Sequence, residues 1–374
     1  MIKVIHLGRF DAPDKGGIES HVQSLCSSLE KKNFYVLNVI SNSRFSFKKS
    51  INGNFEVVSL PAFFKCFSTA FNLILPFYVL KRVIFDNFNI VHIHHPDPLS
   101  HLVTFLLPKK IKIVVTWHSD IVAYKALYFL YKPLLIKLLF RVDKIIVATP
   151  NHIKSSDLLI NNNIRNKIVI IPYGIDYNYL NQKKFIGESF VIKRKYKNKF
   201  LIFTLSRHVY YKGIPHLIEA MKYTNGSLLL IGGSGPDTLK LKQLVLSENL
   251  GSKVIFTGPI PEKHLPSYHH AADVFCLPST ERSEAFGIAM AEAMACSKPI
   301  IVSKLGTGVN YVCTDQTGIA VKIGSALALG KAINRLKQST VLRQFYGRNS
   351  QKRIKTKFSN DIMRKETIKL YNSI

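Results

Sequence analysis

Apolar runs typical of strands alternate with helical segments along this chain, and that alternation limits its fold more than any other feature. Parallel strands buried on both faces form continuous apolar runs, and amphipathic helices connect them. The runs of the first half are KVIHLG (3–8), YVLNVIS (35–41), NIVHIHH (89–95), IKIVVTWH (111–118), KIIVATP (144–150) and KIVIIPYG (167–174). The pattern predicts a doubly wound α/β domain.

The alternation pauses over residues 176–199, which are polar and end in the basic run KRKYKNK (193–199). It then resumes, which predicts a second Rossmann-like domain. The later apolar runs lie at 200–206, 227–233, 253–258, 273–279 and 298–303. We expect an N-terminal domain at 1–180, a linker at 181–199, a C-terminal domain at 200–355, and a last helix at 356–374 that packs back on the N-terminal domain.

The charge of the chain indicates what kind of partner it has. The formal net charge is +29, and the excess of lysine and arginine is spread over both halves. Such a field favours nucleic acid, an anionic membrane surface or phosphorylated substrates. A nucleic-acid-binding protein is therefore one alternative. The sequence has no nucleic-acid motif and no single basic stripe, so we expect no nucleic-acid partner.

Cysteine usage and hydropathy indicate the compartment. The five cysteines are odd in number and form no CxxC pair, which argues against a disulfide framework and a zinc site and favours a reducing cytoplasm. The first residues, MIKVIHLGRF, predict a strand rather than a signal peptide. The most apolar stretch, FNLILPFYVL (71–80), is about half the length of a membrane-spanning helix. We expect a cytoplasmic protein that does not cross a membrane.

Several strand ends carry residues suited to anions. Arg207 and Lys212, in SRHVYYKG (206–213), follow the first strand of the second half, at the end where open parallel sheets bind ligands. Together they could clamp a diphosphate, although a solvated surface pair also explains them. Gly16 and Gly17 precede a helix and could bring backbone N–H groups to an anion, although a simple turn is the alternative. His118 ends a strand, and no ligand spacing supports a metal site.

The segment SEAFGIAMAEAMACSKP (283–299) carries the most information, because two glutamates bracket an apolar run. In one continuous helix, Glu284 and Glu292 would lie on roughly the same side, about 12 Å apart. Helix-forming residues run from Ile288 to Ala295, and Gly287 precedes them. Buried carboxylates need partners, and a helix N-terminus attracts phosphate. The segment therefore suits a sugar nucleotide, with phosphates at the helix start and hydroxyl groups at the two glutamates.

This E-x7-E motif resembles the signature of the group 1 family of retaining glycosyltransferases, of the bacterial surface-polysaccharide type, which have the GT-B fold. Other motifs occur in the family's order, so the resemblance covers nearly the whole chain: GGIESHV, TWHSD, IPYGID, SRHVYYKG, IGGSGP, FTGPIPEKHLPSYHHAADVFCLPS and TGVNYVCTDQTGIAV. It implies two tandem Rossmann-like domains that face a central cleft. The N-terminal domain would be on the acceptor side, and the C-terminal domain would bind the nucleotide sugar.

The resemblance also implies roles for single residues. Arg207 and Lys212 match the basic pair that binds the donor diphosphate, and Glu284 matches the glutamate that contacts the donor sugar. His118 matches the histidine that reaches the donor sugar near the reacting centre. These four are the expected catalytic residues.

The remaining matched positions are expected to bind the donor. Glu292 would hold the ribose, and Gly16 and Gly17 would face the diphosphate across the cleft. The other donor-binding positions supply backbone near the sugar, phosphates or base: Phe286, Gly287, Ile288, Gly258 and Ile260. One departure leaves a contact open, because Asn310 and Tyr311 stand where family members often have an acidic residue.

The expected activity is retaining transfer of a hexose from GDP-mannose or a UDP-hexose to a lipid-linked saccharide, in the synthesis of O-antigen, lipopolysaccharide or capsule. No metal or other cofactor is expected, since cations can meet the charge of the leaving diphosphate. Aromatic and lysine-rich stretches at 63–82 and 123–144 suggest peripheral association with the inner, anionic face of the cell membrane, although buried helices with lysines at their edges also explain them. Another GT-B enzyme, such as a sugar-nucleotide epimerase or a phosphorylase, is the alternative.

Overall fold

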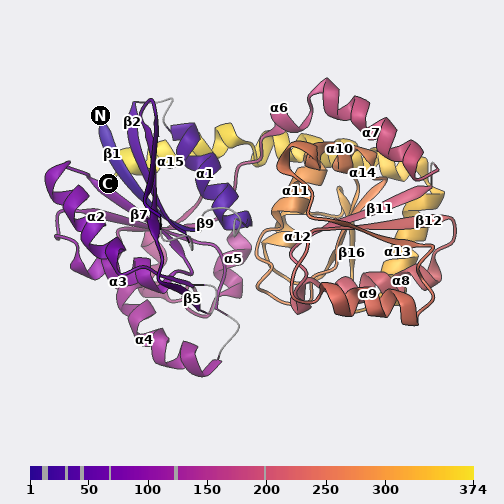
Figure 1. Cartoon of the computed structure of the whole chain (residues 1–374), viewed down its shortest axis with the longest axis horizontal. Helices are drawn as coiled ribbons and strands as arrows, with labels where there is room; N and C mark the ends of the chain where they lie inside the picture. The colour runs from indigo at the N-terminus through magenta and orange to yellow at the C-terminus, as the bar shows by residue number, and fades with distance from the viewer. Residues whose placement is uncertain (11–15, 30–32, 43–45, 67–68, 122–124, 198) are drawn as a thin grey trace. The chain divides into compact units, whose positions relative to one another are not determined.

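The structure is a computed structural model that describes residues 1–10, 16–29, 33–42, 46–66, 69–121, 125–197 and 199–374 (Figure 1). The chain divides into two compact units. Unit 1 comprises Met1–Gly174 together with Asn360–Ile374, and unit 2 comprises Ile175–Ser359. Unit 1 is therefore built from both ends of the chain.

Unit 1 contains an eight-stranded sheet of order β10-β9-β8-β7-β1-β2-β4-β3, in which only β3 runs antiparallel to its neighbour, among the described residues. Its strands are β1 (Ile2–Phe10), β2 (Phe34–Asn42), β3 (Lys48–Asn52), β4 (Phe55–Pro61), β7 (Ile90–His95), β8 (Lys112–Trp117), β9 (Lys144–Val147) and β10 (Ile168–Ile170). A separate hairpin joins β5 (Phe64–Cys66) to β6 (Thr69–Phe71). The helices are α1 (Gly17–Leu29), α2 (Ile74–Phe85), α3 (Pro98–Leu106), α4 (Lys125–Arg141), α5 (Pro150–Ser155), the 3-10 helix η2 (Asn162–Lys167) and α15 (Asn360–Asn372).

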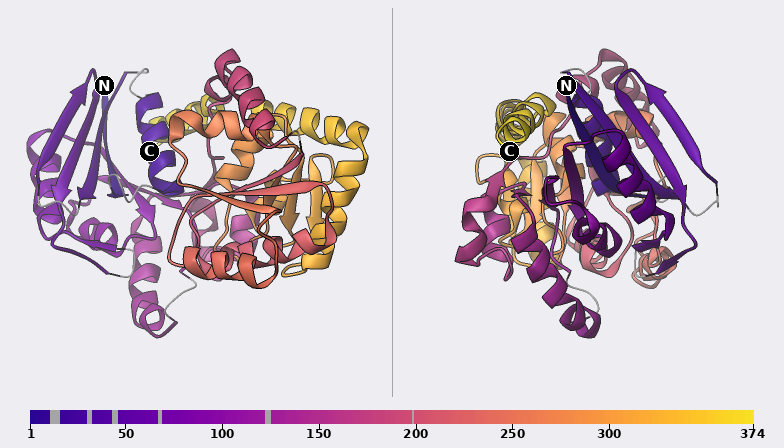
Figure 2. Two further views of the ribbon diagram at one scale, coloured as in Figure 1. Left: turned by 45° about the vertical axis from the view of Figure 1, so that its right-hand side comes forward. Right: turned by 90° about the vertical axis from the view of Figure 1, so that its left-hand side faces the viewer.

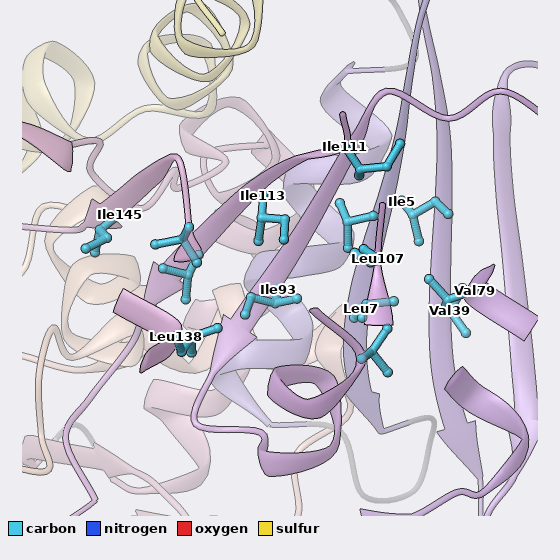
Figure 3. Close-up of a cluster of buried hydrophobic side chains, with 14 of the residues drawn as sticks. Ile5, Leu7, Val39, Val79, Ile93, Leu107, Ile111, Ile113, Leu138 and Ile145 are labelled. Carbon is cyan, nitrogen blue, oxygen red and sulfur yellow. The ribbon is translucent and has the colours of Figure 1, made fainter. Parts of the chain in front are cut away.

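Alternate residues of each strand of unit 1 enter two different cores, because successive side chains point to opposite faces of a sheet. Ile5 packs in a cluster with residues of α2, α3 and α4, part of which Figure 3 shows. Its neighbour Val4 packs on the other face with Leu25 of α1 and Tyr371 of α15. Helices thus cover both faces, which explains the continuous apolar runs of these strands.

Unit 2 has a six-stranded parallel sheet of order β13-β12-β11-β14-β15-β16 (Figure 2). Its strands are β11 (Phe200–Leu205), β12 (Ser227–Gly232), β13 (Val254–Gly258), β14 (Val274–Leu277), β15 (Ile300–Ser303) and β16 (Gly318–Val321). The helices are α6 (Tyr177–Leu180), α7 (Lys183–Lys195), α8 (Ile214–Ala220), α9 (Thr238–Ser247), α10 (Leu265–Ala271), α11 (Ile288–Ala295), α12 (Gly308–Val312), α13 (Ala326–Gln338) and α14 (Thr340–Lys357). Short 3-10 helices are η3 (Tyr210–Lys212), η4 (Met221–Tyr223) and η5 (Glu262–His264).

The predicted α/β class with two parallel-sheet units is confirmed, but the boundaries differ. Residues 181–199, expected to be a linker, contain α7, which belongs to unit 2 and packs on α10. Phe185 is buried there. The basic residues lie in the last helical turn, where the helix dipole favours cations. The last helix, α15, begins at Asn360 and packs on α1 of unit 1.

The helices of the structure were compared with the length and composition of a membrane-spanning segment. Among the residues described, no helix combines the length and the apolar character that crossing a bilayer requires.

A buried ion pair fastens α2 to the sheet of unit 1. Arg82 donates from both terminal nitrogens to the two oxygens of Glu56, each at 2.8 Å, and the Glu56 side chain is fully buried. Tyr35 donates to the same carboxylate at 2.5 Å. Burial would raise the pKa of Glu56, but the hydrogen bonds from Arg82 and Tyr35 outweigh it and lower this pKa to about 2.

We predict that Arg82→Ala lowers the free energy of unfolding by about 3–5 kcal/mol, because it leaves a buried carboxylate without its main partner. The matched control is Lys112→Ala, which removes a pair with Asp143 between half-exposed side chains and costs about 0–1 kcal/mol. Urea unfolding of both variants measures the difference. Equal losses would contradict the buried clamp.

Candidate functional site

Two loops of unit 2 meet at the carboxyl edge of its sheet. The loop after β11 (206–213) and the loop after β14 (278–287) follow neighbouring strands. Thr280 N donates to Tyr211 O at 2.8 Å, and Tyr210 Oη donates to Glu281 at 3.0 Å. Gly213 has φ +65°, and a Cβ there would lie 2.0 Å from Pro278 O. Only glycine permits this approach, so the sequence at 213 brings the two loops together.

An ion pair joins the two loops at their centre. Lys212 Nζ lies 2.5 Å from Glu284 Oε2, and both side chains are largely buried. Burial would lower the pKa of Lys212, but the neighbouring Glu284 carboxylate outweighs it, so the net shift is upward. Lys212 is therefore charged at neutral pH. The structure brings together two residues that lie 72 positions apart in the sequence.

The two carboxylate oxygens of Glu284 differ in their surroundings. Oε2 accepts from Lys212 and also from Ser279 Oγ at 3.0 Å, whereas Oε1 accepts no hydrogen bond from any described residue. Thr307 Oγ1 donates to the Glu284 backbone carbonyl at 2.8 Å. Glu284 is 8% exposed. One oxygen is thus fixed, and the other remains available to a hydroxyl donor.

The two glutamates do not lie on one continuous helix. Helix α11 begins at Ile288 and ends at Ala295, the range predicted from its helix formers, so Glu284 precedes it in a loop. Gly287 is the N-cap residue with φ +79°, and no side chain that the structure describes caps this end of the helix. Phe286 is buried beside it. The first N–H groups of α11 are therefore close in sequence to Glu284 and have no side-chain cap.

Glu292 lies within α11, away from the Lys212–Glu284 pair. Its Oε2 is 3.7 Å from Nε2 of His269, a residue of α10 that is fully buried. Neither ring nitrogen of His269 has a hydrogen-bond partner among the described residues. His269 was not predicted from the sequence, in which the pair HH at 269–270 is the only signal for it.

Arg207 and the glycine-rich turns lie along the same edge. Arg207 is exposed and forms no ion pair with any residue that the structure describes. Gly233 and Gly235 are close to the 206–208 backbone, where a Cβ would lie 2.1 Å from Ser206 O and 2.4 Å from His208 O. These glycines are thus explained by loop packing.

The two residues expected at the base pocket lie at the end of β13, where Gly258 is the last residue of the strand and Ile260 comes after it. Gly258 has φ +72°, its carbonyl accepts from Gly233 N, and a Cβ on Gly258 would meet open space. Ile260 lies beside Gly232.

The family's usual acidic position is also explained here. Asn310 Nδ2 donates to Ser303 O at 3.0 Å, and its Oδ1 accepts from Gly306 N at 2.8 Å. The amide therefore closes the turn after β15, a role that needs both a donor and an acceptor and that a carboxylate could not fill.

In unit 1, Gly16 and Gly17 stand at the start of α1. Gly16 N donates to Glu19 Oε2 at 2.8 Å, which is one half of a capping box, and α1 begins at Gly17. Both glycines are exposed. Residues 11–15, which precede these glycines, lie outside the described residues.

His118 follows β8 and belongs to a buried group of imidazoles. Its Nε2 lies 3.0 Å from His94 Nδ1, and its Nδ1 is hydrogen-bonded to Tyr173 Oη. The residue is 4% exposed, and burial, followed by the charges of neighbouring rings such as His94, lowers its pKa well below the usual value. His118 is therefore neutral, and a ligand that contacts a ring nitrogen must replace one of these two bonds.

Three of the buried imidazoles, His6, His92 and His94, have nitrogens within 4.8 Å of one another, and they are the only group of this kind in the described part of the chain. Their rings do not suit a single ion. His92 and His94 are stacked at 4.7 Å with an interplanar angle of 18°, so their in-plane lone pairs cannot converge on one point. His6 Nδ1 and His94 Nε2 are already hydrogen-bonded at 3.2 Å.

Comparison with known proteins identifies the family. Models described as glycosyl transferases group 1 and Glycosyltransferase Family 4 match residues 185–353 and 15–179. The O-antigen chain mannosyltransferase C of Escherichia coli is 28% identical over 391 residues, which cover 100% of this chain and 99% of that protein. The D-rhamnosyltransferase WbpZ of Pseudomonas aeruginosa is 31% identical over 273 residues, or 72% of this chain and 70% of that protein. The chain belongs to the group 1 family of glycosyltransferases.

The solved structures agree on the fold of this glycosyltransferase. HepE of Anabaena, in complex with UDP-glucose, matches with a TM-score of 0.80 at 16% identity and with all of both chains covered. At that identity the match establishes the fold alone, which is GT-B, as predicted. The Lys212–Glu284 pair, Gly287 and α11 all lie in the part of the glycosyltransferase that the group 1 model matches.

We predict that acid unfolds unit 1 of the glycosyltransferase. Burial lowers the pKa of His6 and of His21 to about 3, and it lowers those of His92, His94 and His118 as well. In the unfolded chain these imidazoles titrate near pH 6.5, so the unfolded state binds more protons below that pH. Stability is complete above about pH 6.5 and is lost as the pH falls toward 3.

Between pH 6.5 and 5, each buried imidazole removes about 2 kcal/mol of stability. Five together approach the whole stability of a domain, about 5–15 kcal/mol. Denaturant unfolding at pH 7.5, 6.5 and 5.5, followed by Trp117 fluorescence in unit 1, measures the loss. Trp117 is the only tryptophan of the chain. A midpoint that does not change with pH would contradict the neutral, buried state of these side chains.

Proposed function

We propose that this glycosyltransferase transfers a hexose, with retention of configuration, from a nucleotide sugar to a lipid-linked saccharide during synthesis of a cell-surface polysaccharide. The observation that carries this proposal is Glu284, a buried carboxylate with one oxygen fixed by Lys212 and Ser279 and the other without a partner among the described residues. The names of the relatives, an O-antigen chain mannosyltransferase and a D-rhamnosyltransferase, support O-antigen, lipopolysaccharide or capsule as the product. GDP-mannose or a UDP-hexose is the proposed donor.

The donor diphosphate is assigned to the cations of unit 2. Negative charge develops on the diphosphate as the glycosidic bond breaks, and fixed positive groups lower that barrier. Lys212 is held at the sheet edge by its bond to Glu284, and Arg207 is exposed on the same loop. The uncapped N–H groups at the start of α11, from Gly287 and Ile288 onward, add to the same field. We assign the leaving group to these residues, without a metal ion.

The two glutamates are assigned to the two hydroxyl-bearing ends of the donor. Glu284 Oε1 would accept from a hydroxyl of the transferred sugar. Glu292, one turn into α11 and about a quarter exposed, would accept from the ribose. Gly258 has open space beside its Cα, and together with Ile260 it would present backbone to the base. Phe286 is buried and supports the loop that carries Glu284.

Unit 1 is assigned the remaining contacts. Gly16 and Gly17 present the exposed start of α1 to phosphate, and His118 contacts the transferred sugar after exchanging its bond with Tyr173. Retention would follow if the departing phosphate oxygen takes the proton of the acceptor hydroxyl on the same face of the sugar. This route requires no protein base.

A thermal-shift screen tests the donor assignment. Wild-type protein is heated with UDP-, GDP-, ADP- and dTDP-sugars, and a donor at 100 times its Kd adds about 2.7 kcal/mol of stability. Glu292→Ala should weaken this stabilisation, whereas Glu284→Ala should preserve most of it and slow transfer. The anomeric configuration of the product, determined by NMR, tests retention. Absence of any shift with all four nucleotides, or an inverted product, would overturn the proposal.

We predict that Lys212→Ala lowers kcat/KM for transfer by about 100-fold or more, because the leaving diphosphate loses a fixed charge. Arg207→Ala should behave similarly. Lys222→Ala is the matched control, since it removes an exposed lysine paired with Glu248 in the same unit and should leave turnover near the wild-type value. Rates near wild type in Arg207→Ala and Lys212→Ala would place the diphosphate elsewhere, and loss of wild-type activity in EDTA would contradict metal-free transfer.

We also propose that unit 1 docks on an anionic membrane surface. Its neighbouring helices α2, α3 and α4 leave large apolar side chains in solvent, including Phe77, Phe85, Phe129 and Leu130, each about three-quarters exposed. Lysines 132 and 137 lie on α4, whereas the side chain of Lys125 is outside the described residues. Exposed apolar residues beside cations suit an interface with anionic lipid, where each cation contributes about 1 kcal/mol.

We predict that Phe129→Ser with Leu130→Ser reduces co-sedimentation with vesicles that contain anionic lipid. Phe190→Ser is the matched control, because Phe190 is 62% exposed but lies on α7 of unit 2. The double variant Lys132→Glu with Lys137→Glu should lose more vesicle binding at low salt than at high salt, because salt screens the attraction. Equal binding to anionic and neutral vesicles would refute electrostatic docking, and an equal loss in the Phe190 variant would refute the assignment to unit 1.

A further inference from the structure

A continuous chain of hydrogen bonds runs through the buried interior of unit 1. From Tyr173 it passes through His118 and His94 to His6, with nitrogen separations of 3.0 Å and 3.2 Å between the rings. His6 Nε2 lies 3.2 Å from Tyr371 Oη, and this hydroxyl lies 2.5 Å from His92 Nδ1. His92 Nε2 ends the chain at Thr116 Oγ1, 2.7 Å away. All seven side chains are at most 4% exposed.

The order of the atoms limits where the protons can be. In each imidazole, Nδ1 is bonded on the side of the Tyr173 end and Nε2 on the side of the Thr116 end. A neutral imidazole has one donor nitrogen and one acceptor nitrogen. Every bond is therefore satisfied only when all four histidines carry their proton on the same type of nitrogen.

The Thr116 end selects one of the two arrangements. Among the residues that the structure describes, Thr116 Oγ1 has His92 Nε2 as its only hydrogen-bond partner. A buried hydroxyl proton without an acceptor is costly. Tyr173, at the other end, takes part in a further interaction besides its bond to His118, so the cost falls on Thr116, and Thr116 donates to His92 Nε2. His92 must then carry its proton on Nδ1, and the same requirement passes through the Tyr371 hydroxyl to His6, His94 and His118.

We propose that Tyr371 of helix α15 is a positioning residue of the transferase: through His6 and His94 it holds His118 as the Nδ1–H tautomer, so that His118 presents an N–H donor to the transferred sugar. The part of this inference that concerns the sugar rests on the proposed function. The part that concerns the tautomer does not. A hydroxyl or ring oxygen of the sugar, rather than a hydroxyl proton, is then the group that His118 recognises.

Nitrogen NMR of wild-type protein labelled in its imidazole rings tests the tautomer directly. His6, His92, His94 and His118 are assigned by single substitutions to glutamine, and all four should show protonated Nδ1 and unprotonated Nε2 at pH 7.5. A mixture of tautomers among the four, or protonation on Nε2 throughout, would overturn the proposal. If these resonances shift when a chelator is added, the imidazoles coordinate a metal, and the proposal would be overturned as well.

Tyr371→Phe tests the positioning role while it keeps the aromatic ring. The variant should release His6, His94 and His118 from the single Nδ1–H form, which their nitrogen shifts would report. Tyr131→Phe is the matched control, because it removes a comparable bond, from Tyr131 Oη to His101 Nδ1, in the same unit. Within the described residues, His101 is not linked to the row of hydrogen bonds from Tyr173 to Thr116, because its Nε2 has no partner. The control should leave all four resonances unchanged.

Activity measurements distinguish the positioning role of Tyr371 from the proposed contact between His118 and the sugar. Tyr371→Phe should lower kcat by about tenfold at an unchanged donor KM, whereas Tyr131→Phe should keep the wild-type kcat. If Tyr371→Phe changes the tautomer but not kcat, the positioning of the tautomer by Tyr371 would stand, and the proposed contact between His118 and the sugar would be wrong. Unchanged imidazole shifts in Tyr371→Phe would overturn the positioning role, whatever the activity.

Discussion

The parallel pairing of strands determines where the chemistry of this protein lies. Parallel strands require a crossover after each one, so all their carboxyl ends open on the same edge of a sheet. In unit 2, that edge receives the loops after β11, β12, β13, β14 and β15. Arg207, Lys212, Ser279, Glu284 and Thr307 are contributed by three of those loops. Strand direction thus brings residues separated by up to a hundred positions to one edge, and Gly213 lets two of the loops approach closely.

The ion pair between Lys212 and Glu284 then gives that edge a defined electrostatic state. Two buried opposite charges at 2.5 Å neutralise each other, which makes it tolerable to keep both in an apolar setting before a ligand arrives. The pair also holds the two side chains in place, so little side-chain freedom remains to be lost on binding. The charge distribution is thus prepared in advance, which is the condition under which electrostatic catalysis is effective.

Sequence patterns predicted those parts of the fold that depend on local composition. The strands with continuous apolar runs, which are β1, β2 and β7 to β15, were found, and so was α11, whereas β3 to β6 and β16 were not. Strand β3 was missed because all five of its residues are exposed at an antiparallel edge. Helix α7 was taken for a linker because its polar and basic residues conceal an apolar face that includes Phe185.

The candidate site was predictable only residue by residue, through motifs. Spacing along the chain identified Glu284 and Glu292 but wrongly allowed them a common helix, since it could not show where α11 begins. The partners Ser279, Thr307 and His269, and the link from His118 to Tyr371, depend on packing between distant segments. No local pattern records such contacts, so they appear only in the folded chain.

The placement of α15 has a consequence for the order in which the two units can fold during synthesis. Unit 1 contains the first 174 residues but also needs Asn360–Ile374, whose Leu370 and Tyr371 are buried in its core. Domains commonly fold in turn as they leave the ribosome, beginning with the N-terminal one. Here the domain that is synthesised first is completed last, after unit 2 has emerged in full. Until residues 360–374 have been translated, the face of β1, β2 and β7 that α15 covers stays open to solvent and to chaperones.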